Sequence, residues 1–224
     1  MTFKDYFSNH ADTYAQFRPA YPSELFAYLS QLVTHHEAVW DCATGNGQVA
    51  IGLTPYFPTI YATDASAQQL EHAFAHPNVI YSIATAEHSL LPDQSVDLVT
   101  VGLALHWFDW NGFYQEVRRV LRPEGAIAAW GYLNIELPFA SPTIQALLAE
   151  FKHTIHPYWA AEIDHIWTCY QNLPFPFQEQ QAPKFVISTH LTLETLVGYL
   201  YSLSAAQRLI QAQGSEPLET LMQQ

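Results

Sequence analysis

The strongest constraint on the fold is an alternation of short β-rich runs and helical stretches between Glu37 and Tyr132. The β-rich runs are apolar and end at glycine, proline or polar turn residues, as buried strands do. They are the segments 38–42, 59–64, 78–84, 96–102 and 126–132. Because helices with short connections separate most of these runs, the pattern predicts βαβ units. We therefore expect an α/β fold with a doubly wound, mostly parallel sheet that is covered on both faces.

The ends of the intervening helices can also be located. A glycine turn precedes a helix through about Leu53, and Ser66 is a natural N-cap for a helix to about Ala75. A third helix is expected from Asn111 to Leu121, because Pro123 prevents it from continuing.

Outside the core (37–132) the pattern is mainly helical, and we expect a single domain over residues 1–224. Residues 3–36 predict an N-terminal cap of two helices, and residues 138–182 predict a helical lid over the ends of the strands. The C-terminal part, 183–224, predicts a sixth strand at 184–189 and then helices at about 192–201, 204–213 and 216–222.

The sixth strand poses a problem of its own. No further strand is legible after Ser215, so the strand at 184–189 would leave unpaired backbone groups at the edge of the sheet. Such edges must be covered or paired. We therefore expect the tail helices from Leu191 onward, or a second subunit, to cover that edge, and the protein to be a monomer or a homodimer.

Charge excludes several functions. Eight Lys and Arg residues against 21 Asp and Glu residues give a net charge of −13, too few cations to neutralise phosphates. We expect neither a nucleic-acid partner nor an anionic membrane partner. No apolar run is long enough for a membrane span, and Met1–Asn9 has no apolar signal stretch. With two cysteines only, reduced thiols and a cytoplasmic location are expected.

The turn after the first strand contains the residues that indicate a bound ligand. In Asp41-Cys-Ala-Thr-Gly45-Asn-Gly47 the two glycines permit a sharp turn and a close approach to a ligand at a helix N-terminus. A glycine pattern of this kind also fits dinucleotide binding. Asp41 favours another ligand, because a carboxylate beside the turn would repel a pyrophosphate but attract the ammonium and sulfonium of S-adenosylmethionine.

An acidic residue also ends the second strand. Asp64 lies where a carboxylate accepts hydrogen bonds from ribose hydroxyls, which any adenosine ligand requires. Asp64 therefore indicates adenosine without choosing the cofactor.

Asp41, the two glycines and Asp64 occur together at the ends of neighbouring predicted strands. The segment from Tyr14 to Tyr132 resembles class I S-adenosylmethionine-dependent methyltransferases. It is most similar to trans-aconitate-methyltransferase-like proteins of the methyltransferase type 11 kind. The resemblance rests on HADTYAQFRPAYPSELF (10–26), WDCATGNGQVA (40–50), ATDAS (62–66), AEHSLLPDQSVDLV (86–99), ALHWFD (104–109) and EVRRVLRPEGAIAAWGY (116–132). It implies a Rossmann-like fold and methyl transfer from S-adenosylmethionine to a small-molecule acceptor, a carboxylate or a hydroxyl.

The resemblance also implies further donor contacts. It places Tyr14 and Arg18 of the cap beside the donor, with Arg18 a candidate for its carboxylate. It places Ala86 and Glu87 at the adenine, and the carbonyls of Gly102 and Leu103 at the ammonium. The implied donor-binding positions are Tyr14, Arg18, Asp41, Ala43, Gly45, Gly47, Asp64, Ala65, Ala86, Glu87, Gly102 and Leu103. Ala43 stands where the family usually has glycine, and Thr85 where it often has aspartate.

Candidates for the acceptor side follow the fourth and fifth strands. His106 is a candidate general base, needed only for an acceptor that must lose a proton, and an orienting residue in the pocket wall is the other interpretation. Trp107 and Tyr132 are candidate substrate contacts at the same end of the sheet. No histidine pair has the further ligands of a metal site.

Two alternative functions remain open on sequence alone. One is a catalytically idle protein that binds S-adenosylmethionine or S-adenosylhomocysteine. The other is a nicotinamide-dependent oxidoreductase, which Asp41 disfavours.

Overall fold

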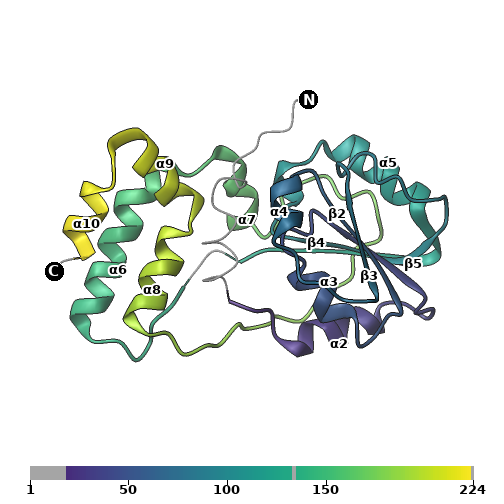
Figure 1. Cartoon of the computed structure of the whole chain (residues 1–224), viewed down its shortest axis with the longest axis horizontal. Coiled ribbons are helices and arrows are strands. Elements are labelled where there is room, and N and C mark those ends of the chain that lie inside the picture. Colours follow the sequence, from purple (N-terminus) through teal and green to yellow (C-terminus); the bar gives the residue numbers. More distant parts are fainter. Residues whose placement is uncertain (1–18, 133–134, 223–224) are drawn as a thin grey trace.

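The computed structural model describes residues 19–132 and 135–222. Their helices and strands follow one another along the chain (Figure 1) in the order α2 (Ser23–Gln31), β1 (Ala38–Cys42), α3 (Gln48–Leu53), β2 (Thr59–Asp64), α4 (Ala67–Glu71), β3 (Val79–Ile83), β4 (Val96–Gly102), η2 (Leu105–Trp107), α5 (Trp110–Val120), β5 (Leu121–Trp130), α6 (Pro142–Ile155), η3 (His156–Tyr158), η4 (Ala161–Ile163), α7 (Asp164–Trp167), α8 (Leu193–Tyr201), α9 (Ser204–Gln213) and α10 (Glu216–Met222).

The predicted sheet is confirmed. Its five strands run in the order β3-β2-β1-β4-β5, and every pairing is parallel. The strand order reverses direction between β1 and β4, which makes their carboxyl ends the switch point where α/β sheets bind ligands.

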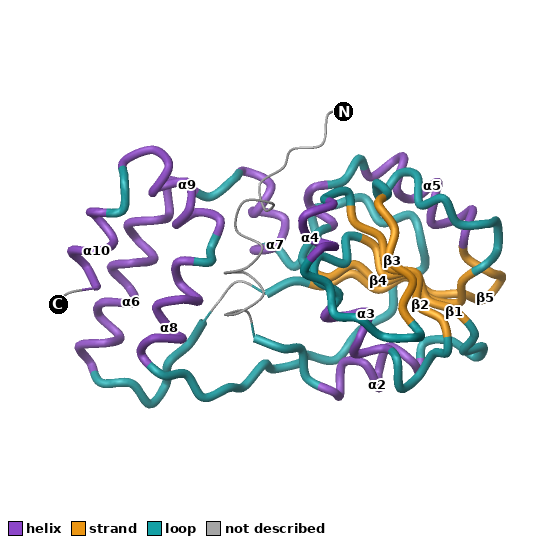
Figure 2. The backbone as a smooth tube through the Cα atoms, viewed as in Figure 1, coloured by secondary structure: helices purple, strands orange, loops and turns teal. Residues whose placement is uncertain are grey.

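Alternating side chains of the central strands supply two cores. From β1, Trp40 packs toward α5 with Phe113, while Val39 packs toward α2 and α3 with Leu29 and Leu53. Helices therefore cover both faces of the sheet, as Figure 2 shows, and β1 and β4 are buried almost throughout.

The predicted ends of the helices and strands of the α/β part (residues 19–132) are close to the observed ends, with two differences. The helix capped by Ser66 ends at Glu71 rather than near Ala75, and Ser66 accepts the predicted capping bond from Gln69 N. The fifth strand is Leu121–Trp130, so it begins before residue 126 and ends two residues before Tyr132.

The tail helices lie where the sequence predicted, but they pack elsewhere. The helices α6, α8, α9 and α10 share a core built around Phe151, Leu200 and Leu209, and we call them the helical bundle. They lie beside the α/β part, residues 19–132, rather than on its sheet (Figure 1). An amphipathic helix buries its apolar face on whichever partner is nearest, and here that partner is α6.

The prediction of a sixth strand is wrong, because residues 184–189 belong to no strand. Their side chains do alternate, with Phe185 and Ile187 partly buried and Val186 exposed, as in extended backbone. Extended backbone becomes a strand only with a hydrogen-bonded neighbour, and this segment has none among the described residues. On the side of the sheet where a sixth strand was expected, the edge strand is β5. The expected covering of a strand at 184–189 by the tail helices therefore also fails.

Candidate functional site

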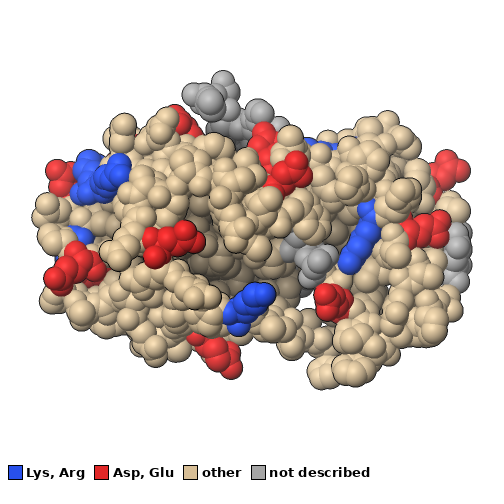
Figure 3. Space-filling model, turned by 180° about the vertical axis from the view of Figure 1, so that it is seen from behind, with Lys and Arg blue, Asp and Glu red and all other residues tan. Residues whose placement is uncertain are grey.

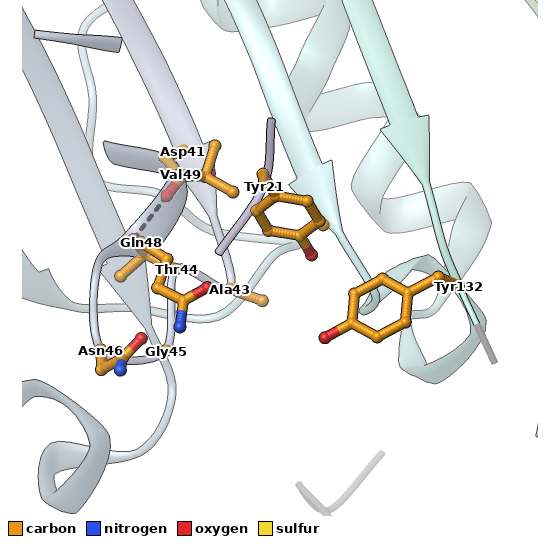
Figure 4. Close-up of a pocket in the computed structure, with 10 residues that line it drawn as sticks. Tyr21, Asp41, Ala43, Thr44, Gly45, Asn46, Gln48, Val49 and Tyr132 are labelled. Atoms are coloured by element: carbon orange, nitrogen blue, oxygen red, sulfur yellow. Dashed lines mark hydrogen bonds between the residues drawn. The ribbon is translucent and has the colours of Figure 1, made fainter. Parts of the chain in front are cut away.

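A pocket opens at the carboxyl ends of β1 and β4, at the switch point of the sheet. It measures about 450 Å³ and is open to solvent (Figure 4). Its lining residues are Tyr21, Asp41, Ala43, Thr44, Gly45, Asn46, Gln48, Val49, Gly102 and Tyr132. The pocket thus brings together the predicted Asp41, Ala43, Gly45, Gly102 and Tyr132.

The glycine turn is shaped by backbone that side chains rarely adopt. Gly45 has φ 57° and Gly47 has φ 86°, and Gly47 is the N-cap residue of α3. A Cβ at Gly47 would collide with the hydroxyl of Tyr81. Gly47 therefore supports the loop from behind, and it does not itself line the pocket.

Ala43 occupies a left-handed conformation as well, with φ 56°. A Cβ in this region of φ/ψ space costs about 1–2 kcal/mol relative to glycine. The family's preference for glycine at this position therefore has a local physical cause, and this chain carries the strain.

Asp41 is 1% exposed, and both carboxylate oxygens accept hydrogen bonds. One accepts from the hydroxyl of Thr44 at 2.5 Å, and the other from the hydroxyl of Thr100 at 2.9 Å. Burial raises the pKa of Asp41 to about 6, although the two hydroxyl groups oppose that rise. The carboxylate is thus a buried acid at the wall of the pocket, poised to favour a cation beside it.

Asn46 carries a second signal for a ligand. Its side chain lines the pocket and the residue is only 3% exposed, yet Nδ2 has no hydrogen-bond partner among the described residues. Buried amides are nearly always satisfied. An acceptor supplied by a bound molecule would complete this one.

Asp64 clamps the turn to the sheet. Its carboxylate accepts from Gly45 N at 2.8 Å and from Ser66 N at 2.9 Å. Asp64 does not line the pocket in this structure, although carboxylate oxygens retain further lone pairs for ribose hydroxyls. Ala65, which lies between Asp64 and Ser66 in the chain, is partly buried.

Ala86 and Glu87 lie outside the pocket. Ala86 is buried in the core on the α5 side, and Glu87 accepts a hydrogen bond from Asp109 N, the N-cap residue of α5, at 3.0 Å. Tyr14 and Arg18 lie outside the described residues.

The end of β4 approaches the pocket closely. A Cβ at Gly102 would lie 3.2 Å from the hydroxyl oxygen of Tyr21. The next residue, Leu103, has φ 56°, and its N–H donates to the carbonyl of Trp130 at 2.8 Å. Glycine at 102 leaves room that a side chain would fill, and Leu103 turns the backbone sharply after the strand.

His106 is buried at the end of β4, in η2, and its Nδ1 lies 3.2 Å from the hydroxyl of Tyr170. Burial lowers the pKa of His106 to about 4. Trp107 packs against its ring, with centroids 4.6 Å apart. On the pocket side, Tyr132 meets Tyr21 edge to face at 6.0 Å.

Tyr21 and Tyr170 were missed by the sequence reasoning. Tyr21 lies next to a proline break, and Tyr170 lies 64 positions from its partner, so no local spacing connects either residue to the strand ends.

Of the three arginines at the end of α5 and the start of β5, two pair with carboxylates, and the exposed Arg118 donates to the carbonyl of Pro176 at 3.0 Å. Arg119 pairs with Glu116 and Asp93, and Arg122 pairs with Asp97. This cluster therefore does not offer a free basic surface to a polyanion. Within residues 19–132 and 135–222, no helix combines the length and apolar character needed to cross a bilayer.

Comparison with known proteins agrees with this geometry. Residues 40–129 match the sequence family described as a methyltransferase domain. A protein of Dictyostelium discoideum named as a methyltransferase is 30% identical over 226 residues, which cover 98% of this chain and 86% of that protein. The chain belongs to the class I S-adenosylmethionine-dependent methyltransferases.

Two further similarities support the assignment. The solved structure of a type II methyltransferase from Anaeromyxobacter dehalogenans superposes with a TM-score of 0.81 at 35% identity, covering 92% of this chain and 86% of that one. A Saccharomyces cerevisiae protein named as S-adenosylmethionine-dependent is 28% identical over 55% of this chain and 45% of its own length. The trans-aconitate subgroup is not distinguished by these similarities.

S-adenosylmethionine is the cofactor of this family, and the pocket fits it. The buried acid Asp41 suits a cationic donor, and the lack of a side chain at Gly102 suits a close approach to the backbone. The unsatisfied amide of Asn46 suits the carboxylate of the methionyl group. A nicotinamide dinucleotide would instead bring a pyrophosphate to the buried acid.

Proposed function

We propose that this methyltransferase acts on a small-molecule acceptor that needs no general base, with a carboxylate as the first candidate. The observation that supports the proposal is the protonation state of His106. With its pKa lowered to about 4, the imidazole is neutral at pH 7 and a weak base. It is poorly matched to a hydroxyl acceptor, whose proton leaves only near pH 10 or above.

The donor-binding roles belong to the same proposal. Asp41 attracts the donor's ammonium, Asn46 Nδ2 donates to its carboxylate, and the carbonyls of Gly102 and Leu103 accept from the ammonium. Asp64 holds Gly45 in place and accepts from the ribose. Ala86 and Glu87 meet the adenine, and Tyr14 and Arg18 close the cap, as the family resemblance implies.

When bound, S-adenosylmethionine supplies an activated methyl group, so the protein's work is alignment and exclusion of water. Tyr21 and Tyr132 both line the pocket, and their rings meet edge to face to form an aromatic wall on one side of it. The face of the molecule opposite to the one seen in Figure 1 is hollowed near its centre (Figure 3). Most of that face carries no charged side chain. An acceptor of modest size fits such a setting.

The location and assembly belong to the proposal too. We expect a cytoplasmic protein, because Cys42 and Cys169 are both unpaired thiols. We expect a monomer or a homodimer, which sedimentation will decide.

The test has two stages. Calorimetry with S-adenosylhomocysteine first establishes binding, with Asp41→Asn as the impaired variant. Radiolabelled donor is then offered with panels of carboxylic acids, phenols, amines and thiols. Transfer to carboxylic acids supports the proposal, and transfer to phenols alone contradicts it. Binding without transfer to any panel would favour the idle binding protein.

A further inference from the structure

Tyr170 reaches the site from outside the methyltransferase domain matched at residues 40–129. It belongs to residues 160–173, which we call the bridging segment because it joins the helical bundle to the ends of β4 and β5. Within it, η4 packs on η2, and Ile166 of α7 is the nearest neighbour of a Cβ built at Gly131. Acceptor contacts contributed by this segment would come from outside the matched methyltransferase domain.

A helix-ending motif sets the position of Tyr170. The N–H of Cys169 donates to Ile166 O at 2.9 Å, and the N–H of Tyr170 donates to His165 O at 2.7 Å. These are the two bonds of a Schellman motif that ends α7. Cys169 and Tyr170 both adopt left-handed backbone, with φ 51° and 62°. Consecutive residues in this region are costly and cluster at functional sites.

The hydroxyl of Tyr170 lies at the exit of two strands. It is 3.2 Å from His106 Nδ1 after β4, and 3.5 Å from where a Cβ of Gly131 would lie after β5. The two rings stack at an angle of 24° with centroids 6.2 Å apart. Gly131 precedes Tyr132, which lines the donor pocket. Tyr170 therefore lies against the residue that precedes the pocket wall at Tyr132.

Both members of the pair are neutral. Burial raises the pKa of Tyr170 well above its usual range, and burial together with His165 lowers that of His106, which Glu162 only partly opposes. The phenol therefore keeps its proton and is able to donate it to Nδ1. The imidazole proton is then on Nε2, which makes no hydrogen bond with any described residue.

We propose that Tyr170 is a positioning residue for methyl transfer. By donating to Nδ1 it holds His106 as the tautomer protonated on Nε2, and that N–H is a hydrogen-bond donor for the methyl acceptor. The role of the pair in catalysis rests on the proposed function, whereas the tautomer can be tested without an acceptor.

The decisive variant is Tyr170→Phe, which removes only the hydroxyl. Tyr114→Phe is the matched control, because Tyr114 is a buried tyrosine whose hydroxyl has no partner among the described residues. Nitrogen-15 spectra of the full chain report the tautomer of each histidine, and His106→Gln identifies the signals of His106.

In the wild type we expect His106 to be protonated on Nε2 alone from pH 8 to pH 5. In Tyr170→Phe both tautomers should be populated, and the titration midpoint should rise by about half a unit or more, because a hydrogen bond to the neutral form is lost. Tyr114→Phe should match the wild type. A wild-type proton on Nδ1, or an unchanged tautomer in Tyr170→Phe, would overturn the proposal.

A kinetic measurement distinguishes failure of this inference from failure of the proposed function. With an acceptor found in the panels, Tyr170→Phe should lower kcat/KM by about tenfold while leaving affinity for S-adenosylhomocysteine unchanged. An unchanged kcat/KM would overturn the positioning role. If no acceptor is methylated, the proposed acceptor class fails, and the tautomer result still decides whether Tyr170 sets the state of His106.

Discussion

In the α/β part, the central strands bury side chains on both faces and end in a polar pocket, whereas the helical bundle buries one core of its own and contributes no residue to that pocket. Between the two, the bridging segment brings Tyr170 to His106. The difference suggests a division of labour. In the proposed function, the sheet and its first turn bind the donor, and the segment attached to the bundle shapes the acceptor side.

The largest effect should come from truncating one core or the other. Phe113 and Phe151 are both fully buried, the first on the face of α5 that packs on the sheet and the second on α6 inside the bundle. Each change to alanine should cost about 3–5 kcal/mol of stability. Phe113→Ala should also abolish binding of S-adenosylhomocysteine, whereas Phe151→Ala should preserve it while amide exchange speeds up in the bundle. Loss of binding in both variants would show that the two cores are not separate.

A second test breaks the clamp on the donor loop. Asp64→Ala removes the acceptor for Gly45 N and Ser66 N and the proposed ribose contact. Affinity for S-adenosylhomocysteine should fall by about 2–4 kcal/mol in calorimetry. The control is Asp93→Ala, which removes an exposed carboxylate paired with Arg119 and should leave affinity unchanged. Equal affinities in the two variants would remove Asp64 from the donor site.

A third test uses pH to isolate Asp41. Because its pKa is raised to about 6, the carboxyl group becomes protonated as the pH falls through 6 and then no longer attracts the ligand's ammonium. Affinity for S-adenosylhomocysteine should therefore be full at pH 7.5 and about tenfold weaker at pH 5. In Asp41→Asn, affinity should be low and nearly independent of pH over this range. A wild-type affinity that rises toward pH 5 would contradict the role of Asp41.

The smallest expected effects come from relieving backbone strain, once in each region. Ala43→Gly in the donor loop and Cys169→Gly at the end of α7 both place glycine where φ is positive. The relief exceeds the extra entropy of glycine in the unfolded chain, so each variant should gain about 0.5–1 kcal/mol in urea unfolding. Destabilisation of either variant would mean that its Cβ makes contacts that outweigh the strain.

Much of the α/β part could be predicted because its signals are local. A run such as 38–42 is apolar except for Asp41, which is typical of a strand buried on both faces. Asp41, Gly45 and Gly47 lie within one turn, so their spacing placed them at the same end of the sheet. The tail helices were also legible, since their periodicity is a property of each segment alone.

What only the tertiary structure decided is which surfaces meet. Alternation at 184–189 is real, but a strand requires a hydrogen-bonding neighbour that no local pattern can supply. The apolar faces of α8 and α9 do not say whether they will meet the sheet or α6. The state of His106 likewise depends on burial and on Tyr170, which a helix end and a left-handed turn bring to it from far along the chain. Residue types and spacing determined the turn that lines the pocket, and packing between distant segments decided that Tyr170 meets His106.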